Sequence, residues 1–142
     1  MVQPKIALQK AGDKRVSAIL KEAFAAGDFD TMGVAVAFAS VAGVNELLES
    51  ILAGRLPTRS HWLFGLDNCI THPDAIERAM KLKGAEVRVS NGQRGVWIFH
   101  PKLYWFSDDG SNSSLVLGSA NLTAGGLGGN VEAVAALEAV TD

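Results

Sequence analysis

The sequence predicts an α/β sandwich with a mixed central sheet flanked by helices, and three observations support this fold class. A chain of 142 residues with 48% hydrophobic content can form one domain with a sizeable core. Short, almost wholly apolar runs alternate with segments of helical periodicity, as expected for strands buried between layers of helices. In the C-terminal third, two apolar runs are separated only by "SDDGSNS" (107–113), which indicates an antiparallel hairpin.

The N-terminal part alternates between helix and strand. Residues 13–26 predict an amphipathic helix, with Asp13 as a capping residue and Gly27 as its end. Residues 32–40 ("MGVAVAFAS") predict a strand that is buried on both faces. A second helix follows, because one face of it collects Val44, Leu47, Leu48, Ile51 and Leu52.

The next segment repeats this order. Residues 61–67 ("HWLFGLD") predict another buried strand. Residues 71–84 predict a helix with Thr71 as its N-cap and Gly84 as its end. Residues 86–90 ("EVRVS") predict a strand, so that three strands connected through helices should lie in one sheet.

The C-terminal part contains the hairpin and one ambiguous segment. Residues 96–106 and 114–118 predict the two hairpin strands. In "NVEAVAALEA" (130–139) the alanines favour a helix, whereas the preceding glycine-rich loop and the mixed polarity allow a strand with Glu132 directed inward. We expect a single domain over residues 1–142, and the ending "EAVTD" is compatible with its being the N-terminal part of a longer protein.

Composition argues against several classes of protein. The N-terminus lacks the apolar core of a signal peptide and the apolar runs are too short to cross a bilayer, which predicts a soluble, cytoplasmic protein without a membrane partner. Cys69 is the only cysteine, so we expect a small buried residue and no disulfide or cysteine-based zinc site. The net charge is −2, and one locally basic stretch is typical of a solvated face: Arg78, Lys81, Lys83, Arg88, Arg94 and Lys102.

One group of polar residues suggests a site for a phosphate anion. His100 and Lys102 are two positions apart in a predicted strand, which directs both side chains to the same face. Across the hairpin, Ser119 and Asn121 follow the partner strand, and "TAGGLGGN" (123–130) lets the backbone approach a ligand closely. Histidine can serve as nucleophile and proton carrier, and lysine supplies a fixed positive charge.

This pattern resembles the phospholipase D superfamily, whose hallmark is His-x-Lys, a polar loop and then Gly-Ser-x-Asn. "HPKLYWF" (100–106) and "GSANLTAGGLGGNVEA" (118–133) match its later elements, and "VAVAFAS", "HWLFGLD" and "AMKLKGAEVRV" are similar to its first strands and helix. The similarity is greatest to the single-motif nuclease branch, with its metal-independent restriction endonucleases and helicase-associated domains. It implies a phospholipase D-like fold whose functional residues are His100, Lys102, Ser119, Asn121 and Glu132.

The resemblance also implies a mechanism. His100 would attack the phosphorus of a phosphodiester and form a phosphohistidine, while a second histidine protonates the leaving group. Lys102 and Asn121 would hold the non-bridging oxygens, Ser119 would add a hydrogen bond, and Glu132 would orient the imidazole of His100. Because the chain has one motif, the second histidine would come from another subunit of a homodimer, and the reaction would need no metal or cofactor.

Two functional classes remain open at this stage. The five matching residues favour a phosphodiesterase, above all a nuclease acting on DNA; the alternative is a noncatalytic nucleic-acid-binding or interaction module of a larger restriction or helicase-type protein. A phospholipid substrate is disfavoured, because no amphipathic membrane-binding segment is visible. The family's signature aspartate is replaced by Ser107, so either Asp108 or Asp109 takes its role or the role is absent.

Other polar and aromatic residues have simpler interpretations. We expect His61 and His72 to be structural or surface residues, since neither has the polar company of the motif. Asp67 and Asn68 end a predicted strand, where α/β sheets bind ligands, which makes them candidates for the rim of the site. Aromatic residues on the predicted strands should serve packing in the core or in an interface: Trp97, Tyr104, Trp105 and Phe106.

Overall fold

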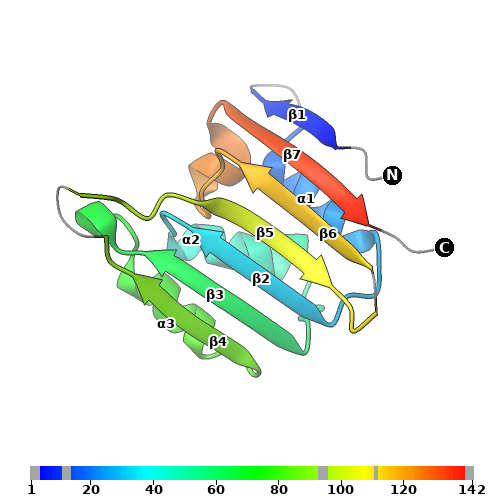
Figure 1. Cartoon of the computed structure of the whole chain (residues 1–142), viewed down its shortest axis with the longest axis horizontal. Helices are drawn as coiled ribbons and strands as arrows, with labels where there is room; N and C mark the ends of the chain where they lie inside the picture. The colour runs from blue at the N-terminus through cyan, green and yellow to red at the C-terminus, as the bar shows by residue number, and fades with distance from the viewer. Residues whose placement is uncertain (1–3, 11–13, 93–95, 111, 140–142) are drawn as a thin grey trace.

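The computed structural model describes residues 4–10, 14–92, 96–110 and 112–139, and within these residues one mixed sheet of seven strands organises the chain. The strand order is β1-β7-β6-β5-β2-β3-β4 (Figure 1). β2, β3 and β4 are parallel, and every other neighbouring pair is antiparallel. The strands are β1 (Lys5–Gln9), β2 (Thr31–Val36), β3 (Arg59–Gly65), β4 (Ala85–Ser90), β5 (Lys102–Ser107), β6 (Ser113–Gly118) and β7 (Glu132–Ala139).

The helices cover one face of the sheet, and those between β2 and β4 connect its parallel strands (Figure 1). The opposite face carries no helix of the described residues. Three α-helices are present in the described part: α1 (Val16–Ala25), α2 (Val41–Asn45) and α3 (Pro73–Met80). Three short helical segments complete them: the π-helical η1 (Glu46–Ile51) and η3 (Gly125–Gly129), and the 3₁₀ turn η2 (Asp67–Cys69).

The core lies between the sheet and this helix layer. Alternate residues of the central strands point into it, as Tyr104 and Phe106 do from β5. The Phe106 ring packs 5.1 Å from that of Phe24 on α1, which closes the layer over β5. Trp105 points to the opposite face, where its ring lies over Gly33 of β2 and leaves no room for a Cβ atom there.

Most predicted elements are confirmed, with their ends shifted by a few residues. The helices near residues 16–25, 41–51 and 73–80 and the strands on β2, β3, β4 and β6 all form. The ambiguous C-terminal segment is the strand β7, and Glu132 at its start is buried, as the strand alternative predicted. Asp13, the expected cap of α1, lies outside the described residues.

Three sequence-based predictions are wrong, and one strand, β1, was not predicted. The cap of α3 is His72 rather than Thr71, because the hydroxyl of Thr71 turns inward and donates to the carbonyl of Ala37 (3.2 Å). Cys69 is exposed on the turn η2. The strand predicted for residues 96–106 begins only at Lys102, because the preceding backbone bonds to loops of β2 and β3 instead of a ladder.

Candidate active site

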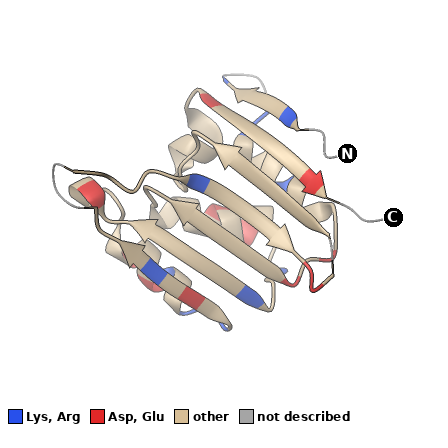
Figure 2. Ribbon diagram, viewed as in Figure 1, with Lys and Arg blue, Asp and Glu red and all other residues tan. Residues whose placement is uncertain are grey.

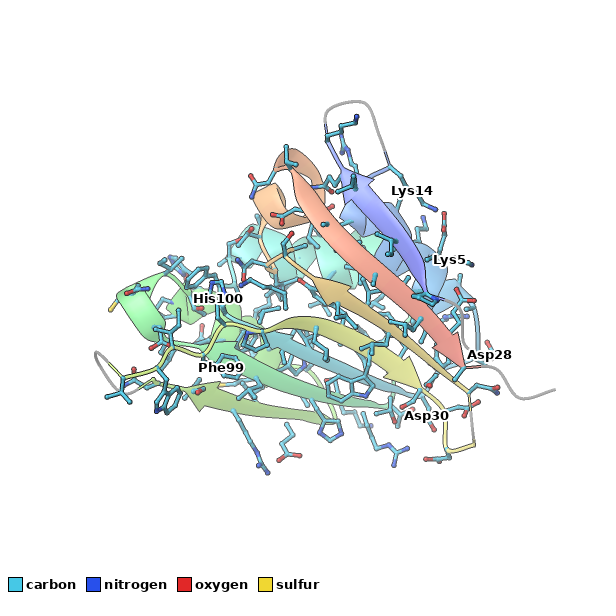
Figure 3. All side chains as sticks on the ribbon, turned by 45° about the horizontal axis from the view of Figure 1, so that its top comes forward. Lys5, Lys14, Asp28, Asp30, Phe99 and His100 are labelled. Atoms are coloured by element: carbon cyan, nitrogen blue, oxygen red, sulfur yellow. The ribbon has the colours of Figure 1, made fainter. Side chains whose placement is uncertain are left out.

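The candidate site lies where β2 ends and β5 begins. Because these strands are antiparallel, Lys102 at the start of β5 faces Val36 at the end of β2. The segments after β2, after β3 and after β6 meet at this end of the sheet, so that distant parts of the sequence converge there. Figure 3 shows His100 and Phe99 together at this end, with Asp28 and Asp30 at the other.

His100 and Lys102 are in direct contact, although not as neighbours on one strand. The Nζ atom of Lys102 lies 2.7 Å from Nδ1 and 3.0 Å from Nε2 of the exposed imidazole. It also donates to the carbonyl oxygen of His100 (3.1 Å). The predicted convergence of the two side chains is therefore found, but the lysine reaches back from the strand to a loop residue that precedes it.

The ammonium of Lys102 is largely shielded from solvent. Its residue is 8% exposed, and burial lowers the pKa of Lys102, while the nearby negative charge of Glu132 acts to raise it. Within the described residues, no carboxylate forms an ion pair with Lys102. A buried cation without a directly paired carboxylate is suited to receive an anion from outside the chain.

The third motif residue, Asn121, is held by the segment after β2. Its Oδ1 accepts a hydrogen bond from the backbone N–H of Phe38 (3.1 Å), which leaves the Nδ2 amide group to donate elsewhere. Leu122 and Phe38 are also joined by a backbone hydrogen bond (3.1 Å). The Phe38 ring meets the imidazole of His100 edge-on at 5.8 Å, so one segment orients both Asn121 and His100.

Ser119 and Glu132 form a separate hydrogen-bonded pair beside this cluster. The hydroxyl of Ser119 donates to Oε2 of Glu132 and accepts from the backbone N–H of Ala133 (3.0 Å). The other oxygen of Glu132 accepts from Nδ2 of Asn130 (3.2 Å). Among the described hydrogen bonds none joins Glu132 to His100, so the orienting role expected for Glu132 stays a prediction, as does a phosphate contact of Ser119.

Close packing fixes the loop that carries Ser119 and Asn121. Tyr104 is buried, which raises its pKa, and its hydroxyl donates to the carbonyl of Ala120 (3.0 Å). A Cβ atom on Gly118 would lie 2.1 Å from the carbonyl oxygen of Ala133. One on Gly126 would lie 2.3 Å from the carbonyl oxygen of Asn121, so both glycines are required by close backbone approach.

Gln9 supports the site from β1, and no pattern in the sequence had indicated this role. Its residue is only 1% exposed, and its Nε2 donates to the carbonyls of Gly126 (3.2 Å) and Asn130 (3.0 Å). Its Oε1 accepts from the N–H of Val16 at the start of α1 (2.6 Å). This one amide therefore ties the glycine-rich loop to the helix layer.

Asp67, expected at the rim of the site, holds a loop instead of pointing a free carboxylate at a ligand. Its two oxygens accept from the backbone N–H groups of Gly92 (3.0 Å) and Phe99 (2.9 Å), the latter next to His100. Asn68 is exposed, with φ at 61°. The sequence placed Asp67 at the correct end of β3 but could not identify its partners.

The remaining predicted residues lie away from the cluster. Asp108 accepts from the N–H of Gly110 (2.9 Å) and Asp109 pairs with Arg59, both at the end of β5 opposite His100. Neither aspartate therefore takes a place beside the imidazole. His61 is half exposed and stacks on Trp105 with the ring planes 9° apart, a surface role as expected.

The basic stretch is not a free cationic surface. Within the described residues three of its exposed members pair with carboxylates, whereas exposed Lys83 has no such ion pair: Arg78 with Glu49 (2.9 Å), Lys81 with Glu77 (3.3 Å), and Arg88 with Glu86. Arg94 lies outside the described residues. Figure 2 shows a basic and an acidic position next to each other on β4, which agrees with the predicted solvated face.

Within the described residues, no group of three or more histidine, cysteine, aspartate or glutamate side chains is arranged to hold a metal ion. None of the helices in that part has both the length and the apolar character needed to cross a bilayer.

Solved structures share this fold. The chain superposes on NucT from Helicobacter pylori with a TM-score of 0.71 at 12% identity, over 96% of this chain and 86% of NucT. For Nuc from Salmonella typhimurium, a phospholipase D family member, the TM-score is 0.61 at 14% identity, over 95% of this chain and 83% of Nuc. For yeast tyrosyl-DNA phosphodiesterase it is 0.61 at 14% identity, and the match spans 32% of that protein.

These similarities confirm the predicted phospholipase D-like fold over nearly the whole chain. No protein-family model matches the sequence, and neither does any curated protein.

Proposed function

We propose that this protein is a metal-independent phosphodiesterase that cleaves DNA through a phosphohistidine on His100. The observation that carries the proposal is the contact between an exposed imidazole and a shielded ammonium, 2.7 Å apart. A phosphate group placed against this pair would neutralise the ammonium and meet a nucleophilic nitrogen at the same time. The oriented amide of Asn121 supplies a further donor for the same anion.

In the proposed reaction, a ring nitrogen of His100 attacks phosphorus and the bond from phosphorus to the leaving oxygen breaks. A second histidine gives its proton to that oxygen and then removes a proton from the water that cleaves the phosphohistidine. Lys102 and Asn121 stabilise the negative charge that develops on the non-bridging oxygens. Each step uses only side chains and water.

DNA is proposed as the substrate on two grounds. The resemblance of the motif is greatest to a nuclease branch, and a structure with this fold is by name a tyrosyl-DNA phosphodiesterase. Three residues of the basic stretch, Arg78, Lys81 and Arg88, are paired with carboxylates, which does not favour the alternative of a passive polyanion-binding module that would use unpaired lysines and arginines.

The second histidine is proposed to come from His100 of a second copy. Because each chain offers one motif, a two-fold axis through the site would bring two imidazoles to one phosphate. This arrangement is tested by mixing equimolar amounts of wild-type and His100→Ala protein, allowing subunits to exchange, and then measuring the activity of the mixture. A shared site predicts about a quarter of the wild-type activity per total dimer, whereas independent sites predict about half.

The nucleophile itself is tested by His100→Ala, with His61→Ala as a matched control that removes a surface imidazole. Plasmid DNA, single-stranded oligonucleotides and bis(p-nitrophenyl) phosphate are the substrates. His100→Ala should abolish turnover and His61→Ala should not. Acid-labile phosphohistidine on His100, trapped during turnover and found by mass spectrometry, identifies the intermediate. Equal cleavage by wild type and His100→Ala excludes this nucleophile, and no cleavage of any substrate by wild type favours the binding-module alternative.

A further inference from the structure

The loop that carries His100 is fastened at two points by one carboxylate. Oδ1 of Asp67 accepts from the N–H of Gly92 (3.0 Å), and Oδ2 accepts from the N–H of Phe99 (2.9 Å). These two amides lie at the start of the connection between β4 and β5 and directly before the proposed nucleophile. The side chain of Asp67, at the end of β3, thus holds the backbone at both ends of this connection, at Gly92 and at Phe99.

The space around Asp67 is closely occupied, which makes the contact specific. A Cβ atom on Gly92 would lie 2.5 Å from Oδ1 of Asp67 and 2.4 Å from the carbonyl oxygen of Trp97. On the other side, a Cβ atom on Gly65 would lie 3.1 Å from the Phe99 ring. The carboxylate and its two amides can therefore move little relative to β3.

Three further contacts complete the position of the imidazole. The N–H of Ala37 donates to the carbonyl of Pro101 (2.8 Å), the Phe38 ring meets the imidazole at 5.8 Å, and Lys102 donates to the carbonyl of His100 (3.1 Å). All three act from the β2 and β5 side. The hydrogen bond from the N–H of Phe99 to Asp67 restrains the backbone from the β3 side, immediately before His100.

We infer that Asp67 is a positioning residue for the proposed phosphodiesterase: its bidentate contact with Gly92 and Phe99 holds His100 at the attack position. The inference rests on the proposed function. Asp67 does not touch the substrate in this role, and Lys102 and Asn121 hold the phosphate in the ground state without its help. Loss of Asp67 should therefore reduce the rate of the chemical step and leave substrate binding largely unchanged.

The test compares Asp67→Ala and Asp67→Asn with Asp28→Asn, which removes an exposed carboxylate at the far end of the molecule (Figure 3). For Asp67→Ala we expect kcat to fall by about 10- to 100-fold with KM within about twofold of wild type, since small misplacement of a reacting group has effects of this size. Asp67→Asn keeps one acceptor oxygen, so its kcat should lie between that of Asp67→Ala and that of wild type. Asp28→Asn should match wild type.

Amide hydrogen exchange supplies a readout that does not depend on activity. In Asp67→Ala the amides of Gly92 and Phe99 should exchange about tenfold faster, while amides in β2 and β3 keep their protection. Should Asp67→Ala not fold, Gly92→Ala provides a second perturbation, because its Cβ displaces the loop from an intact carboxylate.

The outcomes separate the two proposals. Wild-type kcat in folded Asp67→Ala, or unchanged exchange at both amides, overturns the positioning role. A rise in KM at unchanged kcat also overturns it and assigns Asp67 to substrate binding. Absence of turnover in wild type refutes the proposed function, and the exchange experiment then decides by itself whether Asp67 fastens the loop.

Discussion

Replacing Lys102 with methionine should stabilise the fold while removing the anion site. Lys102 is 8% exposed as a residue and, within the described residues, has no paired carboxylate, so desolvation of its ammonium lowers the stability of the folded chain. Methionine has a similar length and volume, and it can occupy the same space without a charge. Stability and function therefore make opposite demands on this position.

The size of the effect follows from two contributions. Burying a polar group costs about 1–3 kcal/mol, and the hydrogen bond from Lys102 to the carbonyl of His100 returns about 1 kcal/mol. With a burial cost of about 2 kcal/mol and a hydrogen bond of about 1 kcal/mol, Lys102→Met should raise the free energy of unfolding by about 1 kcal/mol at neutral pH.

Urea unfolding with and without inorganic phosphate measures both effects. At ten times its Kd, phosphate should stabilise the wild-type protein by about 1.4 kcal/mol. It should give Lys102→Met little or no stabilisation, because the ammonium that binds it is gone. A variant that is less stable than wild type, or one that phosphate stabilises as much as wild type, would refute this reasoning.

The pH dependence of folding stability tests independently whether the pKa of Lys102 is lowered in the folded state. Burial lowers the pKa of Lys102 in the folded state below its usual value of 10.5. Between these two pKa values the unfolded chain binds more protons at this position, so Lys102 makes stability rise with pH up to about 10.5. The difference between wild type and Lys102→Met should shrink over this range, and a constant difference would contradict the shift.

Three further outcomes are expected. Cleavage of DNA or bis(p-nitrophenyl) phosphate should continue in excess EDTA, because the cluster contains no pair of carboxylates for a two-metal mechanism; complete loss that Mg²⁺ restores would refute this. Tyr104→Phe should lower the free energy of unfolding by about 1–2 kcal/mol in urea titrations, since the buried carbonyl of Ala120 loses its donor; an unchanged value would show that this bond contributes nothing. Gln9→Leu should lower it by about 2–4 kcal/mol, because several buried partners lose their hydrogen bonds, and a loss below about 0.5 kcal/mol would show that they find others.

The sequence was sufficient to predict the elements whose burial follows a simple period. β2 and β3 are apolar runs, α1 has one apolar face, and the β5–β6 turn is rich in polar residues. β1 was missed because its pattern is reversed. Ile6 and Leu8 are 79% and 61% exposed, while the polar Gln9 is buried against the glycine-rich loop. Alternation of this kind cannot be recognised without knowing the partner of Gln9.

The chemistry of the site was predictable because its residues lie close together in the sequence. His100 and Lys102 are two positions apart, and they are in contact in the structure. Their supports were not predictable in the same way. The hydrogen bond from Phe38 to Asn121 spans 83 positions, and that from Phe99 to Asp67 spans 32. Such pairs depend on which strands become neighbours, which local patterns do not specify.

These long-range contacts also bear on how a two-fold site could arise. Phe38 and Asp67 follow β2 and β3, two adjacent parallel strands of the sheet, and both act on the residues around His100 within one chain. The imidazole, the ammonium of Lys102 and the amide of Asn121 are thus oriented by contacts that need no second copy. In the proposed dimer, a partner would have to contribute its histidine to a cluster that is already arranged, so association would complete the chemistry without first having to shape the site.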